Sequence, residues 1–334
     1  MGHRITLICL LLCFQWGQSA TAQDIWSQIK EAAEDAWNSD TRKEAWEKTK
    51  QTAQNAWDSD IRKDAWEKTK EVYSDITNSE FIDSKRYTVP LTGRKFFNVI
   101  PDEYIIGCSE DYYKTVTSAS NLSTRNTEIA RVKRVANRLS KAVERFYREQ
   151  GMTDELKNFK WEFNLIKGDE VNAFCMPGGK IAVYEGMMSV AADDASLAVV
   201  IGHEIAHAIA KHASEQMTKG LASSAGLAAV ILAIDSSDMG TASRMLSKML
   251  ASAGLTLAEL KFSRENETES DRLGLIIAAM AGYNPEAAIH FWEKMKKHTS
   301  NKSDHDWFST HPSNTNRIES IRGFLPEAKG YMGK

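Results

Sequence analysis

The chain has 334 residues, of which 42% are hydrophobic and 26% are charged. This balance is ordinary for a folded soluble protein, and the length suffices for one large domain or two smaller ones. The formal net charge of −3 at pH 7 offers no basic surface for nucleic acid, so we expect no nucleic-acid partner.

The first 22 residues have the pattern of a secretory signal peptide. Arg4 precedes an apolar run over residues 5–14, and Ala20-Thr21-Ala22 gives a cleavage site of small residues. The run is shorter than the roughly 20 residues that span a bilayer. We therefore expect residues 1–22 to be removed and the mature protein to be exported.

Two of the four cysteines, Cys108 and Cys175, lie beyond this signal peptide. In an oxidising compartment they could form a disulfide. They could equally be two separate buried thiols. The sequence leaves both alternatives open.

Residues 23–77 contain a 20-residue repeat that is rich in tryptophan. Residues 36–50 recur as residues 56–70, and a partial copy covers residues 26–30. Helix-stop and N-cap residues between the copies predict three short helices. One such unit cannot bury its own apolar face, so the copies must stack or dock. The arm either binds a partner, such as an envelope or membrane-surface component, or packs on the rest of the chain.

Residues 78–101, with Pro90, Gly93 and Pro101, are predicted to form an extended connector. Two helices are predicted next, over residues 102–118 and 124–148. The second repeats apolar residues at three- and four-residue steps.

Strand patterns follow over residues 161–166, 171–176 and 180–184. The last two flank the turn Pro177-Gly178-Gly179 and predict a hairpin-like pair of strands. A free strand edge there could pair with an extended peptide, which makes Asn172, Ala173 and Phe174 candidate substrate-binding residues. The alternative is an ordinary small sheet that shields the core.

An H-E-x-x-H motif begins at His203, within a run over residues 194–216 that is predicted to be one helix. Residues four apart share a helix face, so His203 and His207 can both ligate one zinc ion. Glu204 lies about 100° round the helix and can reach a water bound to that ion. Buried imidazoles and carboxylates are costly without partners, and a metal is the simplest partner. His212 is predicted to face away from the ligand pair and to be structural.

A third ligand is predicted on a later helix that opens at Ser263 and stops near Gly282. Glu267 and Asp271 are four residues apart and share a face. Glu267 can be the third zinc ligand, and Asp271 can accept the free N–H of a ligating histidine. Glu265 and Glu269 share a different face and are predicted to be solvated surface charges.

Taken together, these motifs resemble the HtpX and CAAX prenyl protease family of zinc endopeptidases, and look closest to its periplasmic, β-barrel assembly-enhancing type. The matching segments keep their order and spacing over about residues 100–325. They are Asn172-Ala173-Phe174, Pro177-Gly178-Gly179, the H-E-x-x-H motif, Ser263-Arg264 with Glu267 and Asp271, and Ser309-Thr310-His311-Pro312 with Arg317. Ser270 stands where the family commonly has alanine. The tryptophan repeat falls outside the resemblance.

The resemblance implies an α+β fold, with a mainly helical zincin-like domain over residues 102–334 and a small sheet beside the motif helix. It implies one Zn²⁺ per chain, with His203, His207 and Glu267 as ligands and Glu204 as the catalytic base. It further implies a periplasmic endopeptidase that acts on unfolded or misassembled envelope proteins, and membrane association stays open.

His311 and Arg317 are candidate catalytic residues that could hold the tetrahedral intermediate. Because Pro312 restricts the residue before it to extended conformations, His311 is predicted to lie in a loop. It could then fill the open position of the zinc ion at rest and inhibit the enzyme. The alternative function is a zinc-stabilised scaffold or binding protein whose tryptophan repeat recruits partners.

Overall fold

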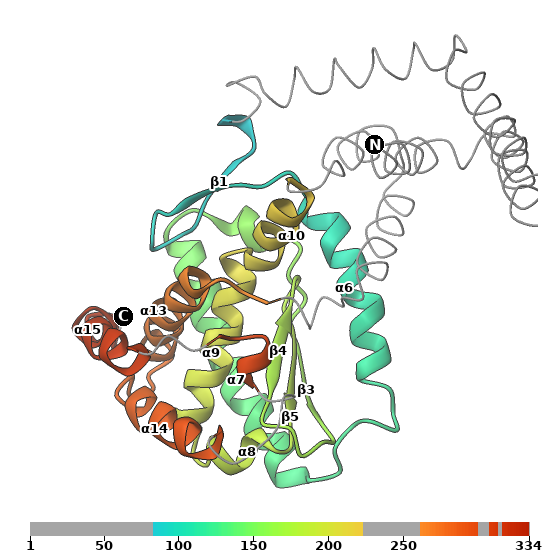
Figure 1. The fold of residues 1–334 in the computed structure, drawn as a ribbon, viewed down its shortest axis with the longest axis vertical. Coiled ribbons are helices and arrows are strands. Elements are labelled where there is room, and N and C mark those ends of the chain that lie inside the picture. Colours follow the sequence, from blue (N-terminus) through green and yellow to red (C-terminus); the bar gives the residue numbers. More distant parts are fainter. Residues whose placement is uncertain (1–82, 223–260, 300–306, 313–315, 334) are drawn as a thin grey trace, which may run out of the picture. The chain divides into compact units, whose positions relative to one another are not determined.

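The fold is described from a computed structural model, which describes residues 83–222, 261–299, 307–312 and 316–333. The predicted signal peptide and the tryptophan repeat of residues 23–77 lie outside the described residues. Within them the chain is mainly helical with two small sheets, as the expected α+β zincin-like class requires (Figure 1).

The described helices and strands follow one another along the chain in this order. They are β1 (Arg86–Thr88), β2 (Lys95–Phe97), α6 (Asp102–Val116), α7 (Asn126–Glu149), the 3₁₀ helix η1 (Thr153–Leu156), β3 (Glu162–Ile166), β4 (Ala173–Met176), β5 (Lys180–Tyr184), α8 (Met187–Val190), α9 (Asp194–Ile209), α10 (His212–Ala222), α13 (Arg264–Met280), α14 (Ala287–Thr299), the 3₁₀ helix η3 (Trp307–Ser309) and α15 (Arg317–Lys329).

The larger sheet has the strand order β3-β5-β4, so β4 is an edge strand among the described residues. β4 and β5 pair antiparallel, which confirms the predicted hairpin, whereas β3 and β5 pair parallel. Gly178 and Gly179 in the connecting turn have φ angles of +87° and +84°. Side chains disfavour that backbone region, so the turn depends on its glycines.

Part of the stretch predicted to be an extended connector forms a second sheet. β1 and β2 pair antiparallel, and the turn between them spans residues 89–94. Val89 and Phe96 of this hairpin are buried in the hydrophobic core. The hairpin therefore packs as part of the domain and does not merely lead into it.

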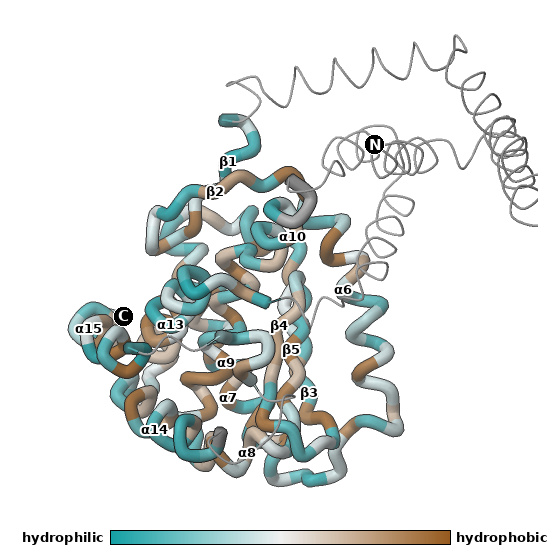
Figure 2. Tube along the Cα trace, viewed as in Figure 1, coloured by the Kyte–Doolittle hydropathy of each residue, from teal (hydrophilic) through white to brown (hydrophobic). Residues whose placement is uncertain are grey.

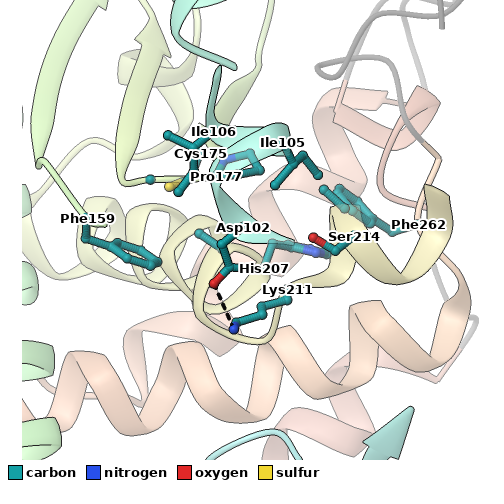
Figure 3. A pocket seen from close by; sticks show the side chains of 13 residues that line it. Asp102, Ile105, Ile106, Phe159, Cys175, Pro177, His207, Lys211, Ser214 and Phe262 are labelled. Atoms are coloured by element: carbon teal, nitrogen blue, oxygen red, sulfur yellow. Dashed lines mark ion pairs between the residues drawn. The ribbon is translucent and has the colours of Figure 1, made fainter. Parts of the chain in front are cut away.

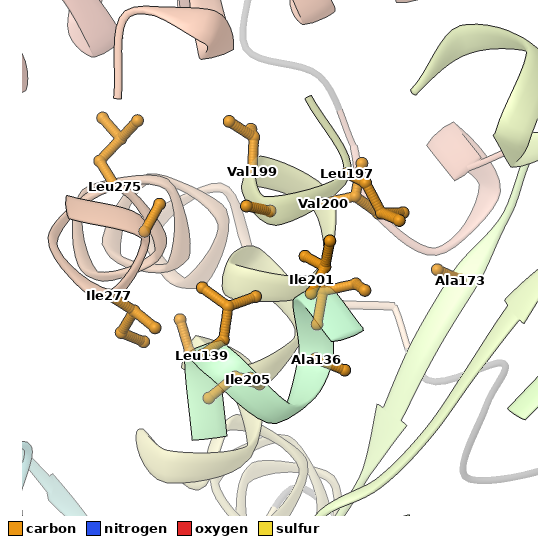
Figure 4. Packing of buried hydrophobic residues seen from close by; sticks show 14 of the residues in the cluster. Ala136, Leu139, Ala173, Leu197, Val199, Val200, Ile201, Ile205, Leu275 and Ile277 are labelled. Carbon is orange, nitrogen blue, oxygen red and sulfur yellow. The ribbon is translucent and has the colours of Figure 1, made fainter. Parts of the chain in front are cut away.

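The core lies where α7 and α9 pack on the larger sheet and α13 packs on these two helices. Figure 4 shows Leu139 of α7, Ile201 of α9 and Ile277 of α13 packed together, with Ala173 of β4 nearby. Figure 2 shows apolar residues along α9, whose residues from Ser196 to Ile209 are all buried. Burial on all sides fixes this helix within the domain. No helix in the described ranges is both long and apolar enough to cross a membrane.

The single helix predicted over residues 194–216 is wrong, because the chain breaks after Ile209. Lys211 adopts a left-handed φ of +55°, and α10 restarts at His212. Side chains from elsewhere hold the break: Tyr87 Oη donates to the carbonyl of Ile209 at 3.3 Å, and Lys211 Nζ pairs with Asp102 at 2.9 Å. The break turns α10 relative to α9, which decides where His212 lies.

Candidate metal centre

The H-E-x-x-H motif lies in the last two turns of α9. Asp193 caps the helix by accepting a 2.7 Å hydrogen bond from the backbone N–H of Ser196. From this fixed start the helical period places His203 and His207 on one face, as predicted. Both imidazoles are buried, with 2% and 3% of each residue exposed.

Helix α13 brings a carboxylate to this pair. Ser263 and Asn266 form a reciprocal capping box at its start, which confirms the predicted opening. Glu267 Oε2 lies 3.4 Å from His203 Nε2, and Glu267 Oε1 lies 3.3 Å from His207 Nε2. The two histidine Nε2 atoms are 3.0 Å apart.

A fourth donor comes from the loop after η3. His311 Nδ1 lies 3.0 Å from Glu267 Oε1 and 3.4 Å from His203 Nε2. Four side chains each offer one donor atom, and these four atoms all lie within 4.8 Å of one another. They belong to His203, His207, Glu267 and His311. The structure thus brings together the three predicted ligands and His311.

This donor set fits a zinc ion. Zinc bonds of about 2.0–2.1 Å in a tetrahedron place neighbouring donor atoms roughly 3.3–3.4 Å apart, close to the 3.0–3.4 Å separations between these atoms. Glu204 Oε1 and Glu267 Oε2 are buried and have no hydrogen-bond partner. Buried carboxylate oxygens without partners are costly, and a cation at the cluster relieves that cost.

The second nitrogen of His203 faces the acid predicted for it. His203 Nδ1 lies 3.0 Å from Asp271 Oδ1, which fits a donated N–H. Arg317 holds Asp271 in turn, through Nε at 2.7 Å and Nη2 at 2.8 Å. The guanidinium of Arg317 also stacks 3.5 Å from the ring centre of Trp292. Arg317 is buried at 5% exposure, and its Nη1 atom, which has no hydrogen-bond partner, lies 3.4 Å from Glu267 Oε2.

The second nitrogen of His207 faces His212, which the sequence pattern predicted to face away. His212 Nδ1 lies 2.9 Å from His207 Nδ1, so His212 does not face away from the ligand pair. The break after α9 brings His212 back to His207. Glu269, predicted to be a surface charge, is buried and lies 2.9 Å from His212 Nε2. Glu265 is exposed, as predicted.

Glu204 lies beside the ligand cluster and against the edge strand. Its Oε2 accepts a 3.1 Å hydrogen bond from the backbone N–H of Cys175, and its Oε1 is 3.6 Å from His311 Nε2. Burial raises the pKa of Glu204 to about 7, and the nearby His311 opposes that rise. A carboxylate in this range can both accept and donate a proton near neutral pH.

The ligand side chains have shifted pKa values of their own. Burial would raise the pKa of Glu267, but His311, His203 and His207 outweigh burial and hold it well below its usual range. Burial lowers the pKa of His207 well below its usual value, despite the opposing carboxylate of Glu267. Zinc binds carboxylates and neutral imidazoles, so both shifts favour the binding forms.

His311 is held by an aromatic platform. Its ring stacks on Trp307, with centroids 4.4 Å apart, and its backbone N–H donates to the carbonyl of Trp307 at 2.9 Å. Trp307 N donates to the carbonyl of Val171, just before β4. Phe262, which packs 4.0 Å from His207 between ring centroids, donates its N–H to the Thr310 carbonyl. The loop histidine is therefore fixed by residues on both sides of the cluster.

A pocket that is partly open to solvent lies beside His207 (Figure 3). Its apolar walls come from α6, the segment before β3, the turn after β4 and the segment before α13. They include Ile105, Ile106, Phe159, Pro177 and Phe262. The ion pair between Asp102 and Lys211 lies at this pocket. His207 also lines this pocket, which therefore borders the motif helix.

The predicted peptide-binding residues lie in or next to the edge strand, and the hydrogen bond to Glu204 comes from the residue that follows them. Phe174 pairs with Ala182 of β5, and the carbonyl of Asn172 accepts from Tyr184 N. Cys175, one residue beyond the predicted segment, supplies the backbone contact to Glu204. Cys175 and Cys108 carry separate thiols and form no disulfide with each other.

Several functional positions escaped the sequence reasoning. His212 and Glu269 were assigned other roles, and Trp307, Phe262 and Cys175 were not considered as site residues. The segment Trp307–Ser309 carries no distinctive sequence motif. The one usable signal was that His212 follows the motif closely, since a buried imidazole there needs a partner.

Known proteins are similar in sequence to this chain. The family model described as Peptidase family M48 matches residues 133–325. The mitochondrial metalloendopeptidase OMA1 of Schizosaccharomyces pombe is 35% identical over 245 residues, which is 72% of this chain and 67% of that protein. The OMA1 protein of Arabidopsis thaliana is 36% identical over 169 residues, covering 51% of this chain and 32% of that protein.

The β-barrel assembly-enhancing protease of Escherichia coli is 29% identical over 168 residues, which is 48% of this chain and 34% of that protein. Its match is shorter and less identical than that of the S. pombe protein, although its type is the one that the motifs favoured. The alignments with these three relatives span between 32% and 67% of the relatives' own lengths.

Proposed function

This chain belongs to peptidase family M48 and is a zinc metalloendopeptidase, and we propose that its substrates are unfolded or misassembled proteins of a cell envelope. One observation carries the proposal. The buried cluster of His203, His207 and Glu267 lies next to Glu204, which itself contacts the backbone of an edge strand.

The edge strand suits an extended substrate. In β4 the N–H of Cys175 points away from β5 and towards Glu204. A substrate segment that adds to this edge aligns its backbone by main-chain hydrogen bonds, without demanding a particular side chain. Asn172, Ala173 and Phe174 would then guide the segment, and the pocket beside His207 would take one apolar side chain. Unfolded chains expose such segments, whereas folded proteins bury them.

Glu204 is the proposed general base. When bound, zinc supplies a Lewis acid that polarises the scissile carbonyl and makes water more acidic. Glu204 accepts the proton of the attacking water and then delivers it to the leaving amine. Arg317 is proposed to support this step in two ways. It holds Asp271 through Nε and Nη2, and it places Nη1, which has no hydrogen-bond partner, 3.4 Å from Glu267.

His311 is proposed to gate the site. Its Nδ1 atom lies among the ligand atoms, so at rest it can occupy the position that the reaction needs open. Withdrawal of the loop over residues 307–312 would free that position. Loops anchored by a few contacts are suited to such switching. The alternative role of His311, holding the tetrahedral intermediate, predicts the opposite effect of its removal.

The compartment follows from the leader pattern at residues 1–22, which favours export to a periplasm. The similarity to proteins named as mitochondrial makes an organelle compartment the other outcome. We further propose that the tryptophan repeat of residues 23–77 recruits an envelope or membrane-surface partner, and that the catalytic residues all lie after it in the sequence.

Cleavage of an unfolded protein such as reduced casein tests the proposal. The full chain is expected to cleave it, to lose activity with a zinc chelator and to regain it with added Zn²⁺. Glu204→Gln is expected to keep one zinc per chain but to lose at least about 100-fold in kcat, as removal of a general base does. Glu265→Gln, an exposed change on α13, is the control.

The scaffold alternative predicts the opposite pattern. Zinc would then stabilise the protein without any chelator-sensitive cleavage, and Glu204→Gln would match the wild type in every assay. Cleavage of a folded protein as fast as of its unfolded form would contradict the proposed substrate class while leaving the peptidase activity intact.

A further inference from the structure

The two ligating histidines have different outer partners, and only one of these partners is a carboxylate. His203 Nδ1 faces Asp271, which Arg317 holds. His207 Nδ1 faces another imidazole, that of His212, which is fully buried. A ligating histidine needs its second nitrogen fixed, because that bond sets the tautomer and the ring orientation.

The distances fix the direction in which the hydrogens point. His207 Nε2 faces His203 Nε2 and Glu267 Oε1, so Nε2 is its ligand atom and Nδ1 must carry the hydrogen. His207 Nδ1 therefore donates, and His212 Nδ1 accepts across 2.9 Å. A neutral imidazole has one N–H, so His212 carries its own on Nε2. That N–H points at Glu269 Oε2 across 2.9 Å.

The chain of contacts continues to the hairpin of β1 and β2. Arg94 Nε donates to Glu269 Oε2 at 2.7 Å, and its two terminal nitrogens donate to Glu215 at 3.0 and 2.8 Å. Thr92 Oγ1 donates to the other oxygen of Glu269. The turn of the hairpin thus sets the position of the carboxylate that His212 contacts.

We propose that His212, Glu269 and Arg94 form a positioning relay that holds His207 in its zinc-binding tautomer and orientation. The hairpin over residues 86–97 is then part of the metal centre, although it precedes the segment that the family model matches. Ser270, the departure from the family pattern, adds a hydroxyl 3.2 Å from His212 Nδ1. The inference rests on the zinc site and not on the proposed substrate.

The first test compares two substitutions of His212 in the full chain, with zinc affinity measured by competition against a chromogenic chelator. In His212→Asn the side-chain oxygen can take the place of Nδ1 and accept from His207. His212→Leu has similar bulk and no acceptor. The leucine variant is expected to bind zinc about 10–100-fold more weakly, the usual cost of losing an outer partner. The asparagine variant is expected to recover most of that loss.

Wild-type affinity in His212→Leu would overturn the relay, and so would equal losses in the two variants, because packing alone would then explain the effect. Histidine-selective ¹⁵N NMR of the zinc-loaded protein supplies an independent readout. His212 is expected as the Nε2–H tautomer and His207 as the Nδ1–H tautomer. A hydrogen on Nδ1 of His212 would contradict the assignment.

A variant at the far end of the relay keeps the proposal testable if His212→Leu fails to fold. The side chain of Arg94 is 28% exposed, so Arg94→Gln disturbs the core less. Its matched control is Arg272→Gln. Arg272 lies on α13, and this change breaks its pair with Glu327, which is another arginine–glutamate pair. Arg94→Gln is expected to weaken zinc binding severalfold, about as an outer-partner loss does. An effect no larger than that of Arg272→Gln would overturn the hairpin's role.

Discussion

Gly202 of α9 and Gly274 of α13 lie directly against each other. A Cβ atom on Gly274 would come within 2.8 Å of the backbone nitrogen of His203, and one on Gly202 within 2.9 Å of the Gly274 carbonyl oxygen. Neither position has room for a side chain. This close approach brings the helix that carries the two histidines next to the helix that carries Glu267.

Gly274→Ala is therefore expected to force α9 and α13 apart. Backbone cannot give way as a flexible side chain can, so the expected loss is about 1–3 kcal/mol of unfolding free energy, or more. Zinc affinity should fall as well, because the ligands lie on both helices. Thermal melts with and without zinc would measure both effects.

Gly323→Ala on α15 is the control, since an added Cβ there meets nothing within 4 Å. It is expected to be neutral or to stabilise by up to about 1 kcal/mol, as alanine does in a helix. Equal melting temperatures for Gly274→Ala and Gly323→Ala would show that the helices can separate without cost.

Glu267→Ala is expected to reduce zinc affinity by more than about 100-fold, since loss of an outer partner alone costs roughly 10–100-fold. Glu265→Ala, two residues away on the exposed face, should bind zinc as the wild type does. Metal analysis after dialysis separates the two variants. Retained zinc in Glu267→Ala would remove this carboxylate from the ligand set.

His311→Ala tests whether the loop histidine gates the site. If the competent state is populated at about 10% at rest, removing the gate raises basal cleavage up to about 10-fold. Cleavage of casein should be compared with the wild type at equal zinc content. His290→Ala, at an 80% exposed histidine, is the matched control. A clear fall in turnover with zinc retained would favour the transition-state role and exclude the gate.

The ionisation of Glu215 is expected to make the free energy of unfolding depend on pH. Burial would raise its pKa, but hydrogen bonds from Arg94 and Lys219 outweigh burial and lower the pKa from 4.5 to about 2. The folded state thus binds this proton less readily than the unfolded state. The stabilisation is complete above about pH 4.5 and is lost as the pH falls towards 2.

Glu215→Gln should accordingly lose less stability than the wild type between pH 4.5 and pH 2. The difference is on the order of 1–2 kcal/mol after screening by solvent near Lys219 is allowed for. Denaturant melts across this range, with Glu265→Gln as control, would measure it. Parallel pH curves for wild type and Glu215→Gln would show that the carboxylate is not held by its partners.

The sequence by itself determined which residues share a helix face, because that depends only on helical periodicity. His203 and His207 are four residues apart, as are Glu267 and Asp271, so each pair shares a face whatever surrounds the helix. The cap at Ser263 and the turn at Gly178-Gly179 are equally local, and the structure has both where the sequence predicts them. Local spacing therefore predicted the three zinc ligands correctly.

Tertiary structure decided the contacts that cross long stretches of chain. Arg94 meets Glu269 across 175 residues and Cys175 meets Glu204 across 29, and no periodicity encodes either pair. His212 was misplaced because α9 ends at Ile209, where Tyr87 and Asp102 from distant segments hold the break. A helix boundary set by partners outside the helix cannot be read from the helix itself, and His212 reaches His207 only because of that boundary.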